Sequence, residues 1–253
     1  MARRLTGTQG GEGQGRVPTL VAQIVEELSQ DILEGRFAPG QRIREQDLAD
    51  RFQTSRAPVR EAIRLLEIDG LIETQHWRGA SVVELSVDEI DDLFEMLSAL
   101  FGLVAKLAAR HGSRSDMRLF EAAVDRMRRA RSENVSPVER VKIAFDAAGV
   151  LRRMCGSTRV SEMLLRTSRI AFLNHKVALS ADEAWQQEAL TDWRRLGVAI
   201  SDRDDEGAET IARGIVRRTQ TFTMSKLRGE EGAGASPALP RARLRRRTPE
   251  PAA

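Results

Sequence analysis

Three arginines, Arg56, Arg60 and Arg64, follow one another at intervals of four residues. On a helix this spacing places them on one side. Apolar residues occupy the opposite, inward side: Val59, Ala62, Ile63 and Leu66. A guanidinium group can form two parallel hydrogen bonds with a phosphate or with the edge of guanine. A solvated arginine face is the ordinary alternative, so the elements around this helix decide between the two.

The preceding segment has the features of a helix-turn-helix. Residues 20–34 have apolar residues at helical spacing, Gly35 ends that helix, and Pro39-Gly40 makes a turn. A short helix over residues 45–52 is expected to bury its apolar residues, Leu48, Ala49 and Phe52. The arginine helix opens at Thr54-Ser55, where a hydroxyl can cap free N–H groups, and Pro58 is tolerated in a first turn. Together these signals favour a DNA-reading helix.

A hairpin is expected after Gly70. Residues 71–75 and 81–85 have strand patterns, with His76, Trp77, Arg78 and Gly79 at the tip between them. Such a wing would carry His76 and Arg78 to phosphates or to an adjacent groove. Alternatively, Trp77 packs on its own domain.

This segment resembles the winged helix of the GntR family of bacterial regulators over about 70 residues, from GRFAPGQRIREQDLADRFQTSRAPVREAIRLLEIDGLI to RGASV. By position, the resemblance implies base contacts for Arg56 and Arg60 and a phosphate contact for Ser55. Arg44 stands where many relatives have a capping serine. The full set of DNA-binding candidates is Arg44, Gln46, Ser55, Arg56, Arg60, Arg64, His76, Arg78 and Gly79.

Composition places limits on the rest of the chain. The 253 residues carry a formal charge of only +3, so a nucleic-acid footprint must come from local clustering. Cys155, the only cysteine, excludes a disulfide framework and is expected to be a buried structural thiol in a reducing cytoplasm. No apolar run is long enough for a membrane span and no signal peptide is apparent, so a cytoplasmic protein with no membrane partner is expected.

The expected fold is mainly α, with an N-terminal winged helix-turn-helix followed by an antiparallel all-α bundle of about six helices. We expect a disordered arm at residues 1–16, the DNA-binding domain at 17–85, a helical effector-binding and dimerisation domain at 86–228, and a disordered basic tail at 229–253. Turn signals divide the bundle into helices at about 87–110, 115–133, 137–155, 158–179, 182–202 and 205–227.

This second region resembles the FCD domain of the FadR-like subfamily. The resemblance depends on the opening VDEIDDLFEMLSALFGLVAKLAAR and on the turns LRRMCGS and AISDRDDEGA. Many relatives hold a divalent metal there with one aspartate and three histidines, beside an arginine and a glutamate. The matching positions here are apolar and form the candidate effector pocket: Leu97, Phe101, Ala144, Ala148, Trp193 and Ile215.

We therefore expect no metal and no cofactor. The nearest carboxylates, Asp146 and Asp192, do not fall on the ligand positions, and because each residue along a helix turns by about 100°, they are expected to point away from the chamber. His111 and His175 lack a partner at ligand spacing and are interpreted as structural or solvent-facing. The chamber is either filled by Trp193 and Phe101 or open to a small apolar effector.

The resulting functional hypothesis is a homodimeric transcriptional regulator, in this family most often a repressor, that binds a short palindromic operator in double-stranded DNA. An effector-independent regulator whose bundle serves only dimerisation is the alternative. An enzyme would require a convergent set of catalytic groups. The acidic turn at residues 202–206 is better explained as a helix end and the N-terminal charge of the next helix.

Overall fold

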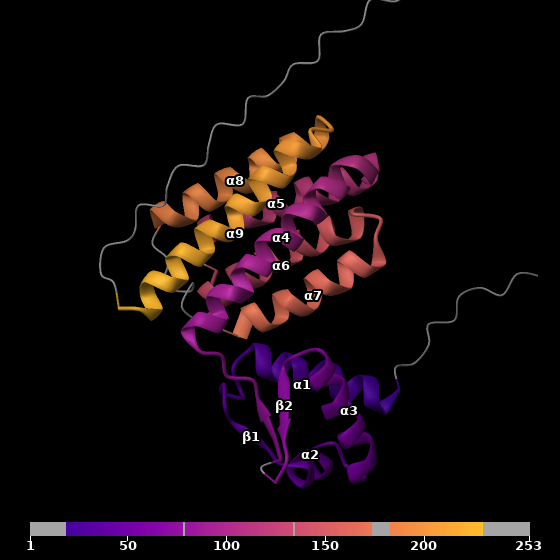
Figure 1. The fold of residues 1–253 in the computed structure, drawn as a ribbon. Coiled ribbons are helices and arrows are strands. Elements are labelled where there is room, and N and C mark those ends of the chain that lie inside the picture. Colours follow the sequence, from indigo (N-terminus) through magenta and orange to yellow (C-terminus); the bar gives the residue numbers. More distant parts are fainter. Residues whose placement is uncertain (1–18, 78, 134, 174–182, 230–253) are drawn as a thin grey trace, which may run out of the picture. The chain divides into compact units, whose positions relative to one another are not determined.

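A computed structural model of the chain describes residues 19–77, 79–133, 135–173 and 183–229 (Figure 1). The chain forms two compact units. One contains residues up to Phe37 together with Gln41–Val82, and the other contains Ala38–Gly40 and the chain from Val83 onward. The predicted arm at 1–16 and the arginine-rich tail beyond Gly229 lie outside the described residues. Among the helices described, none is long and apolar enough to cross a membrane.

The first unit, called the reader below, combines three helices and a small sheet. Its elements are α1 (Leu20–Leu33), β1 (Arg42–Ile43), α2 (Glu45–Arg51), α3 (Arg56–Ile68), β2 (Ile72–Gln75) and β3 (Gly79–Val82). α1 begins where Thr19 accepts a hydrogen bond from the backbone N–H of Ala22, at 3.2 Å. It ends just before Gly35, whose φ of 78° suits glycine. The mainly α fold with a winged helix-turn-helix is as predicted from the sequence.

The sheet departs from the prediction in two places. Its strand order is β1-β3-β2, all antiparallel, so a third strand that the sequence analysis did not identify completes it. The last strand covers Gly79–Val82 rather than residues 81–85, because Gln75 pairs with Gly79 and the chain reverses over only three residues. The expected burial of Phe52 is also wrong, since this residue caps the end of α2 and is half-buried.

An ionic cluster joins the first two helices of the reader. Asp31 is 2% exposed, and its carboxylate accepts hydrogen bonds from Arg36, after α1, and from Arg51, the last residue of α2. Beneath it, Ile24, Leu28 and Leu66 are fully buried where α1 packs against α3. The cluster fixes α2 relative to the α1–α3 core, and this in turn orients the face that α2 shares with α3.

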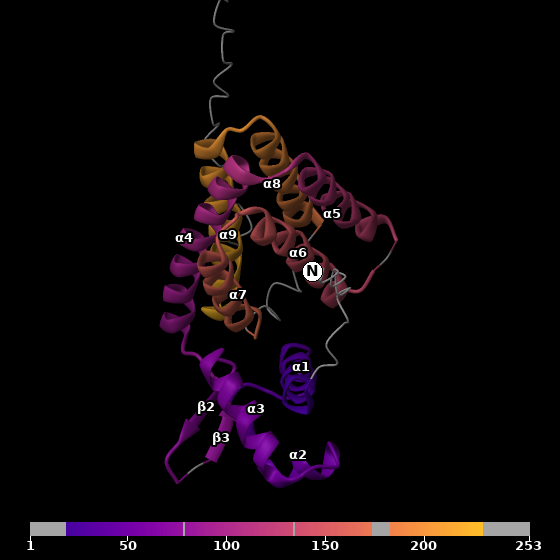
Figure 2. The same cartoon turned by 90° about the vertical axis from the view of Figure 1, so that its right-hand side faces the viewer.

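The second unit is a bundle of six helices within the described residues: α4 (Val87–His111), α5 (Arg114–Ser132), α6 (Pro137–Met154), α7 (Thr158–Leu173), α8 (Glu183–Ser201) and α9 (Asp205–Leu227) (Figure 2). These bounds agree closely with the predicted ones. The last part of the predicted helix 158–179, with His175, lies outside the described residues.

Local capping explains where these helices start. Ser86 and Glu89 form a reciprocal capping box at α4, and Ser113 and Asp116 form another at α5. The hydrogen bonds from Ser86 hold the pKa of Glu89 below its usual value. Those from Ser113 do the same for the pKa of Asp116.

α4 is the central helix and packs against α6, α7, α8 and α9. It runs antiparallel to α9, since Arg110 near its end bonds Asp205 at 2.5 Å, while Asp91 near its start accepts from Gln220 at 2.8 Å. Arg203, in the turn before α9, donates to carbonyl groups at the end of α4. Cys155 is buried in this core, and its thiol donates to the carbonyl of Ser157.

Candidate nucleic-acid interface and ligand cavity

The arginine helix begins one residue after Ser55, which takes the N-cap position of α3. The Ser55 hydroxyl makes no capping hydrogen bond, so the expected side-chain cap is wrong for this residue. An N-cap residue can adopt its extended backbone without that bond, and Ser55 has φ −79° and ψ 166°. Its exposed hydroxyl therefore lies at the N-terminus of α3 beside unsatisfied backbone N–H groups.

Side chains of α2 restrain the exposed arginines of α3. Arg56 Nε donates to Gln46 Oε1 at 2.7 Å, and Gln46 in turn donates to Asp50 at 2.7 Å. Arg60 Nε donates to Glu45 Oε2 at 2.8 Å. The sequence analysis identified both arginines and Gln46 but missed the carboxylates of Glu45 and Asp50, which lie on the same face.

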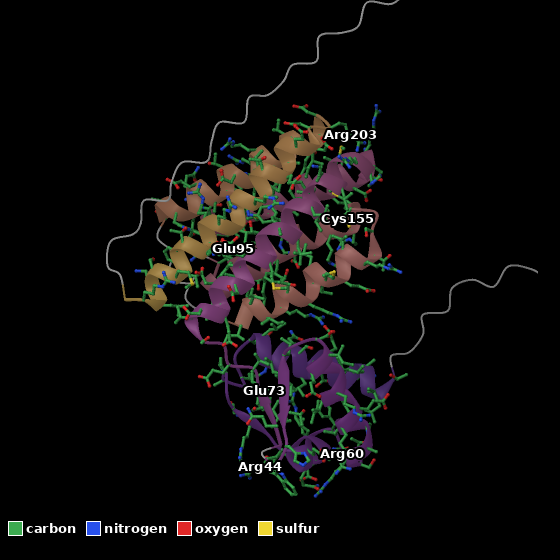
Figure 3. All side chains as sticks on the ribbon, viewed as in Figure 1. Arg44, Arg60, Glu73, Glu95, Cys155 and Arg203 are labelled. Carbon is green, nitrogen blue, oxygen red and sulfur yellow. The ribbon has the colours of Figure 1, made fainter. Side chains whose placement is uncertain are left out.

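The side chains of the other two arginines of this surface, Arg44 and Arg64, are exposed and make no hydrogen bond or ion pair within the described part of the chain. Arg44 is the N-cap residue of α2 and, as expected from its type, provides no side-chain cap. Figure 3 shows Arg44 and Arg60 at the same end of the reader. Guanidinium groups from both helices thus share one solvent-facing surface.

His76 and Trp77, at the tip of the hairpin, are exposed. Trp77 is 95% exposed with a positive φ of 71°, so it does not pack on the reader. His76 lies edge-on to it, with ring centroids 4.8 Å apart. Gly79, with φ 79°, opens β3. Arg78, the predicted wing arginine, lies outside the described residues.

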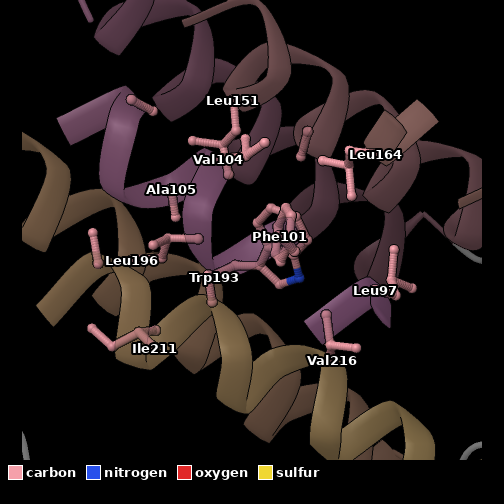
Figure 4. Packing of buried hydrophobic residues seen from close by; sticks show 14 of the residues in the cluster. Leu97, Phe101, Val104, Ala105, Leu151, Leu164, Trp193, Leu196, Ile211 and Val216 are labelled. Carbon is pink, nitrogen blue, oxygen red and sulfur yellow. The ribbon is translucent and has the colours of Figure 1, made fainter. Parts of the chain in front are cut away.

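A cavity of about 620 Å³ lies inside the helical bundle. All six positions chosen from the sequence line it: Leu97, Phe101, Ala144, Ala148, Trp193 and Ile215. Figure 4 shows Phe101 and Trp193 next to each other, and their ring centroids are 5.7 Å apart. The two rings fill one side of the chamber, and a cavity remains beside them.

The cavity wall is more polar than expected. Both aspartates line it: Asp192 is buried there, against the expectation that it points away, whereas the Asp146 side chain is 62% exposed. Neither carboxylate is free, since Arg126 donates to Asp146 at 3.1 Å and Arg218 donates to Asp192 at 3.0 Å.

Metal-ligating groups do not gather in this wall. Across the described ranges, no three His, Cys, Asp or Glu side chains are placed together to hold a metal ion. His111 is an exposed residue at the end of α4. The sequence analysis missed Arg218, because nothing in its local pattern reveals a carboxylate partner on another helix.

Comparison with known proteins agrees with the two-unit architecture. Residues 20–82 match the model for bacterial regulatory proteins of the gntR family, and residues 92–218 match the FCD domain. The uncharacterized HTH-type transcriptional regulator YdhC of Bacillus subtilis is 30% identical over 121 residues, or 48% of this chain. That match covers 54% of YdhC, so the chain spans about half the length of this relative.

Two further similarities extend over most of the chain. The HTH-type transcriptional regulator Mce2R of Mycobacterium tuberculosis is 25% identical over 225 residues, covering 81% of this chain and 92% of that protein. The solved structure of E. coli McbR/YncC superposes with a TM-score of 0.72 at 17% identity, covering 83% of this chain and 99% of the other, and so shares the fold. The chain therefore belongs to the GntR family of bacterial regulatory proteins and carries an FCD domain after its winged helix-turn-helix.

Proposed function

We propose that the protein is a cytoplasmic repressor, not an enzyme, that binds a short palindromic operator as a homodimer. The observation that carries the proposal is the arginine surface formed by α2 and α3, because guanidinium groups on an exposed helix can read guanine in the major groove. In this proposal Arg56 and Arg60 contact bases. Ser55, Arg44 and Arg64 contact phosphates and set the register of the reader on the duplex.

The wing adds a second contact. His76 and Gly79 are exposed, and Arg78 between them has a side chain suited to a phosphate or a narrow groove. Gln46 takes part indirectly, since it holds Arg56 in place through its side-chain oxygen.

Alanine substitution of Arg56 tests the proposal. Loss of a bidentate base contact should weaken operator binding by roughly 1–3 kcal/mol and relax the preference at one base pair. Arg114→Ala removes the same charge from an exposed position of the bundle and serves as the control. Fluorescence anisotropy with an operator selected from random DNA measures both variants. Equal weakening on operator and scrambled DNA would show that Arg56 contacts only phosphate.

Dimerisation is proposed to use the outer face of α4. Met96 and Leu103 are 55% and 37% exposed, and with Leu100 and Leu107 they recur at alternating intervals of four and three residues. This spacing produces an apolar seam that suits packing against the same helix of a second copy. Burial of such a seam removes apolar surface from water without requiring new polar partners.

A charge placed in this seam tests its role. Met96→Glu should convert the dimer to a monomer in light scattering coupled to size exclusion. Leu119→Glu puts the same charge on an equally exposed apolar position of α5, 56% exposed, and should leave the dimer intact. A dimer that tolerates Met96→Glu and breaks with Leu119→Glu would place the interface elsewhere.

The cavity supports control by a small effector with a large apolar part. Its volume of about 620 Å³ falls within the range of small-molecule sites. The alternative, an effector-independent regulator, is supported by the packing of Phe101 against Trp193, which occupies part of the chamber. Native mass spectrometry of the purified dimer separates the two, since a bound organic adduct supports the effector and bare chains support the alternative.

A further inference from the structure

One aromatic side chain of the reader is left almost entirely in water. Trp77, at the tip of the β2–β3 hairpin, is 95% exposed, whereas the next most exposed large apolar residue of the described chain, Ile68, is 61% exposed. An indole ring that packs into a fold or against a partner buries about 150–250 Å². Trp77 therefore keeps a large apolar surface that is available to a partner.

The backbone at Trp77 is strained as well. Its φ of 71° lies in the left-handed region, which a residue with a bulky side chain rarely adopts. The hairpin reverses over three residues, since Gln75 pairs with Gly79, and glycine adopts a positive φ without this cost. The turn itself would thus favour glycine at position 77. A tryptophan that neither packs nor suits its own turn indicates a role in binding.

A neighbouring ring orders the exposed indole. The rings of His76 and Trp77 lie edge to face, with centroids 4.8 Å apart and an interplanar angle of 75°. Edge-to-face packing of this kind is favourable between aromatic rings. It restricts the rotamers of Trp77 before a partner binds, so less conformational entropy is lost on binding. His76 thus positions Trp77 at the tip of the hairpin.

The hairpin lies at the end of the reader that carries the arginine surface. Figures 1 and 2 show β2 and β3 extending toward the end of the reader at which α2 lies. Arg44 and Arg60 are at this end in Figure 3. Major and minor grooves alternate along one side of a duplex, so with α3 in a major groove a hairpin beside it faces the flanking minor groove.

Duplex DNA is the partner that best suits this ring. Phosphates are bound by charged and hydrogen-bonding groups, which the arginine surface already supplies. The part of a duplex that an apolar side chain can bind is the base stack, and proteins in the minor groove insert apolar wedges between base pairs in this way. An aromatic ring can also stack on a base of any type.

We propose that Trp77 is a wedge that enters the minor groove beside the site of α3 and partly unstacks one base step of the operator. This inference rests on the proposed DNA binding and adds a residue that selects sequence without a hydrogen bond to a base. Pyrimidine–purine steps, TA and CA/TG, are the easiest to kink. Trp77 therefore makes the protein prefer such a step at a fixed distance from the bases that Arg56 and Arg60 contact.

Two substitutions in the full-length chain separate the ring from the backbone. Trp77→Gly removes the ring and suits the positive φ, so the melting temperature should not fall. Its affinity for the operator selected from random duplexes, measured by fluorescence anisotropy, should nevertheless fall about ten-fold, which is within the range of one base–aromatic stacking contact. Trp77→Phe keeps an aromatic wedge and should lose less than about three-fold. Ile68→Ala, which removes another exposed apolar side chain of the reader, is the control and should leave the affinity unchanged.

An adenine analogue that fluoresces when it is unstacked tests the wedge directly. In this experiment 2-aminopurine replaces each adenine of the selected operator in turn. The unsubstituted chain and Trp77→Phe should raise the fluorescence at one pyrimidine–purine step, whereas Trp77→Gly should not. Selection from random duplexes by Trp77→Gly should likewise lose the preference for that step and keep the bases that Arg56 and Arg60 contact.

Several results would overturn the wedge. If Trp77→Gly selects the same operator and binds it as tightly as the unsubstituted chain, the ring makes no contact with DNA. Weaker binding by Trp77→Gly without an unstacking signal from the unsubstituted chain would place the ring against sugar or phosphate. A changed oligomeric state of Trp77→Gly in the absence of DNA would assign the ring to a protein contact. Failure of the unsubstituted chain to select any operator would instead overturn the proposed DNA reading, and the wedge with it.

Discussion

Glu45 is expected to limit how strongly the reader binds DNA of any sequence. Its carboxylate holds Arg60 at 2.8 Å, with the two side chains 35% and 62% exposed. An exposed pair of this kind is worth roughly 0.2–1 kcal/mol, and two like charges 4 Å apart in water repel by about 1 kcal/mol. Glu45→Gln frees Arg60 for phosphates and removes a charge that repels them. Affinity for scrambled DNA should therefore rise by about 1 kcal/mol, or roughly five-fold.

Operator binding should respond differently. The same ion pair orders the Arg60 side chain before it meets a base, and ordering a long side chain costs about 0.5–1.5 kcal/mol. Glu45→Gln loses that benefit, so affinity for the operator should rise less than about two-fold. The specificity ratio, which is the affinity for the operator divided by that for scrambled DNA, should therefore fall.

Anisotropy titrations on operator and scrambled duplexes at one salt concentration measure this ratio. Asp47→Asn, which removes an exposed charge from the same helix without breaking an ion pair, is the control. An unchanged or increased ratio for Glu45→Gln would refute the reasoning.

Three further predictions concern stability. Arg203→Ala removes hydrogen bonds of 2.8 and 2.7 Å to the end of α4 and should cost about 1–3 kcal/mol in urea unfolding; a loss below about 0.5 kcal/mol would contradict that role. Asp31→Asn weakens the cluster joining α1 and α2 and should lower the melting temperature of the reader, while the bundle transition stays in place. Hydrogen bonds from Lys106 and then Arg213 hold the pKa of Glu209 below its usual 4.5. Its stabilisation is therefore present above the usual pKa and lost as pH falls through the lowered pKa, so Glu209→Gln should lower Tm at neutral pH, and the difference in Tm should shrink as the pH falls below the usual value.

Much of the fold could be predicted because it follows from local patterns. The capping boxes of Ser86 and Ser113 mark the first residues of two helices. The spacing of apolar residues between the turn signals indicates the six helices of the bundle. The missed elements depend on partners distant in sequence. β1 has only two residues, Arg42 and Ile43, and exists because β3 pairs with it. A run of two residues has no periodicity from which a strand could be predicted.

In the candidate sites, too, residues placed by a local pattern could be predicted, and residues whose role depends on a distant partner could not. Arg56 and Arg60 could be chosen from their spacing on one helix, and the apolar lining of the cavity from its alignment with a family pattern. The roles of the Glu45 carboxylate and of the buried Arg218 could not be predicted from the sequence, because they depend on contacts between helices. A charged residue on an amphipathic helix is usually solvated, so the sequence alone gives no sign that Arg218 is buried.

The most direct test of the central claim is selection of binding sites from random-sequence duplexes by the full-length chain, followed by native mass spectrometry of the complex. The account predicts enrichment of one short palindrome bound by two chains, with the enrichment reduced by Arg56→Ala and Arg60→Ala. Retention of all sequences alike, or no retained DNA, would contradict the proposal that the surface formed by α2 and α3 reads an operator.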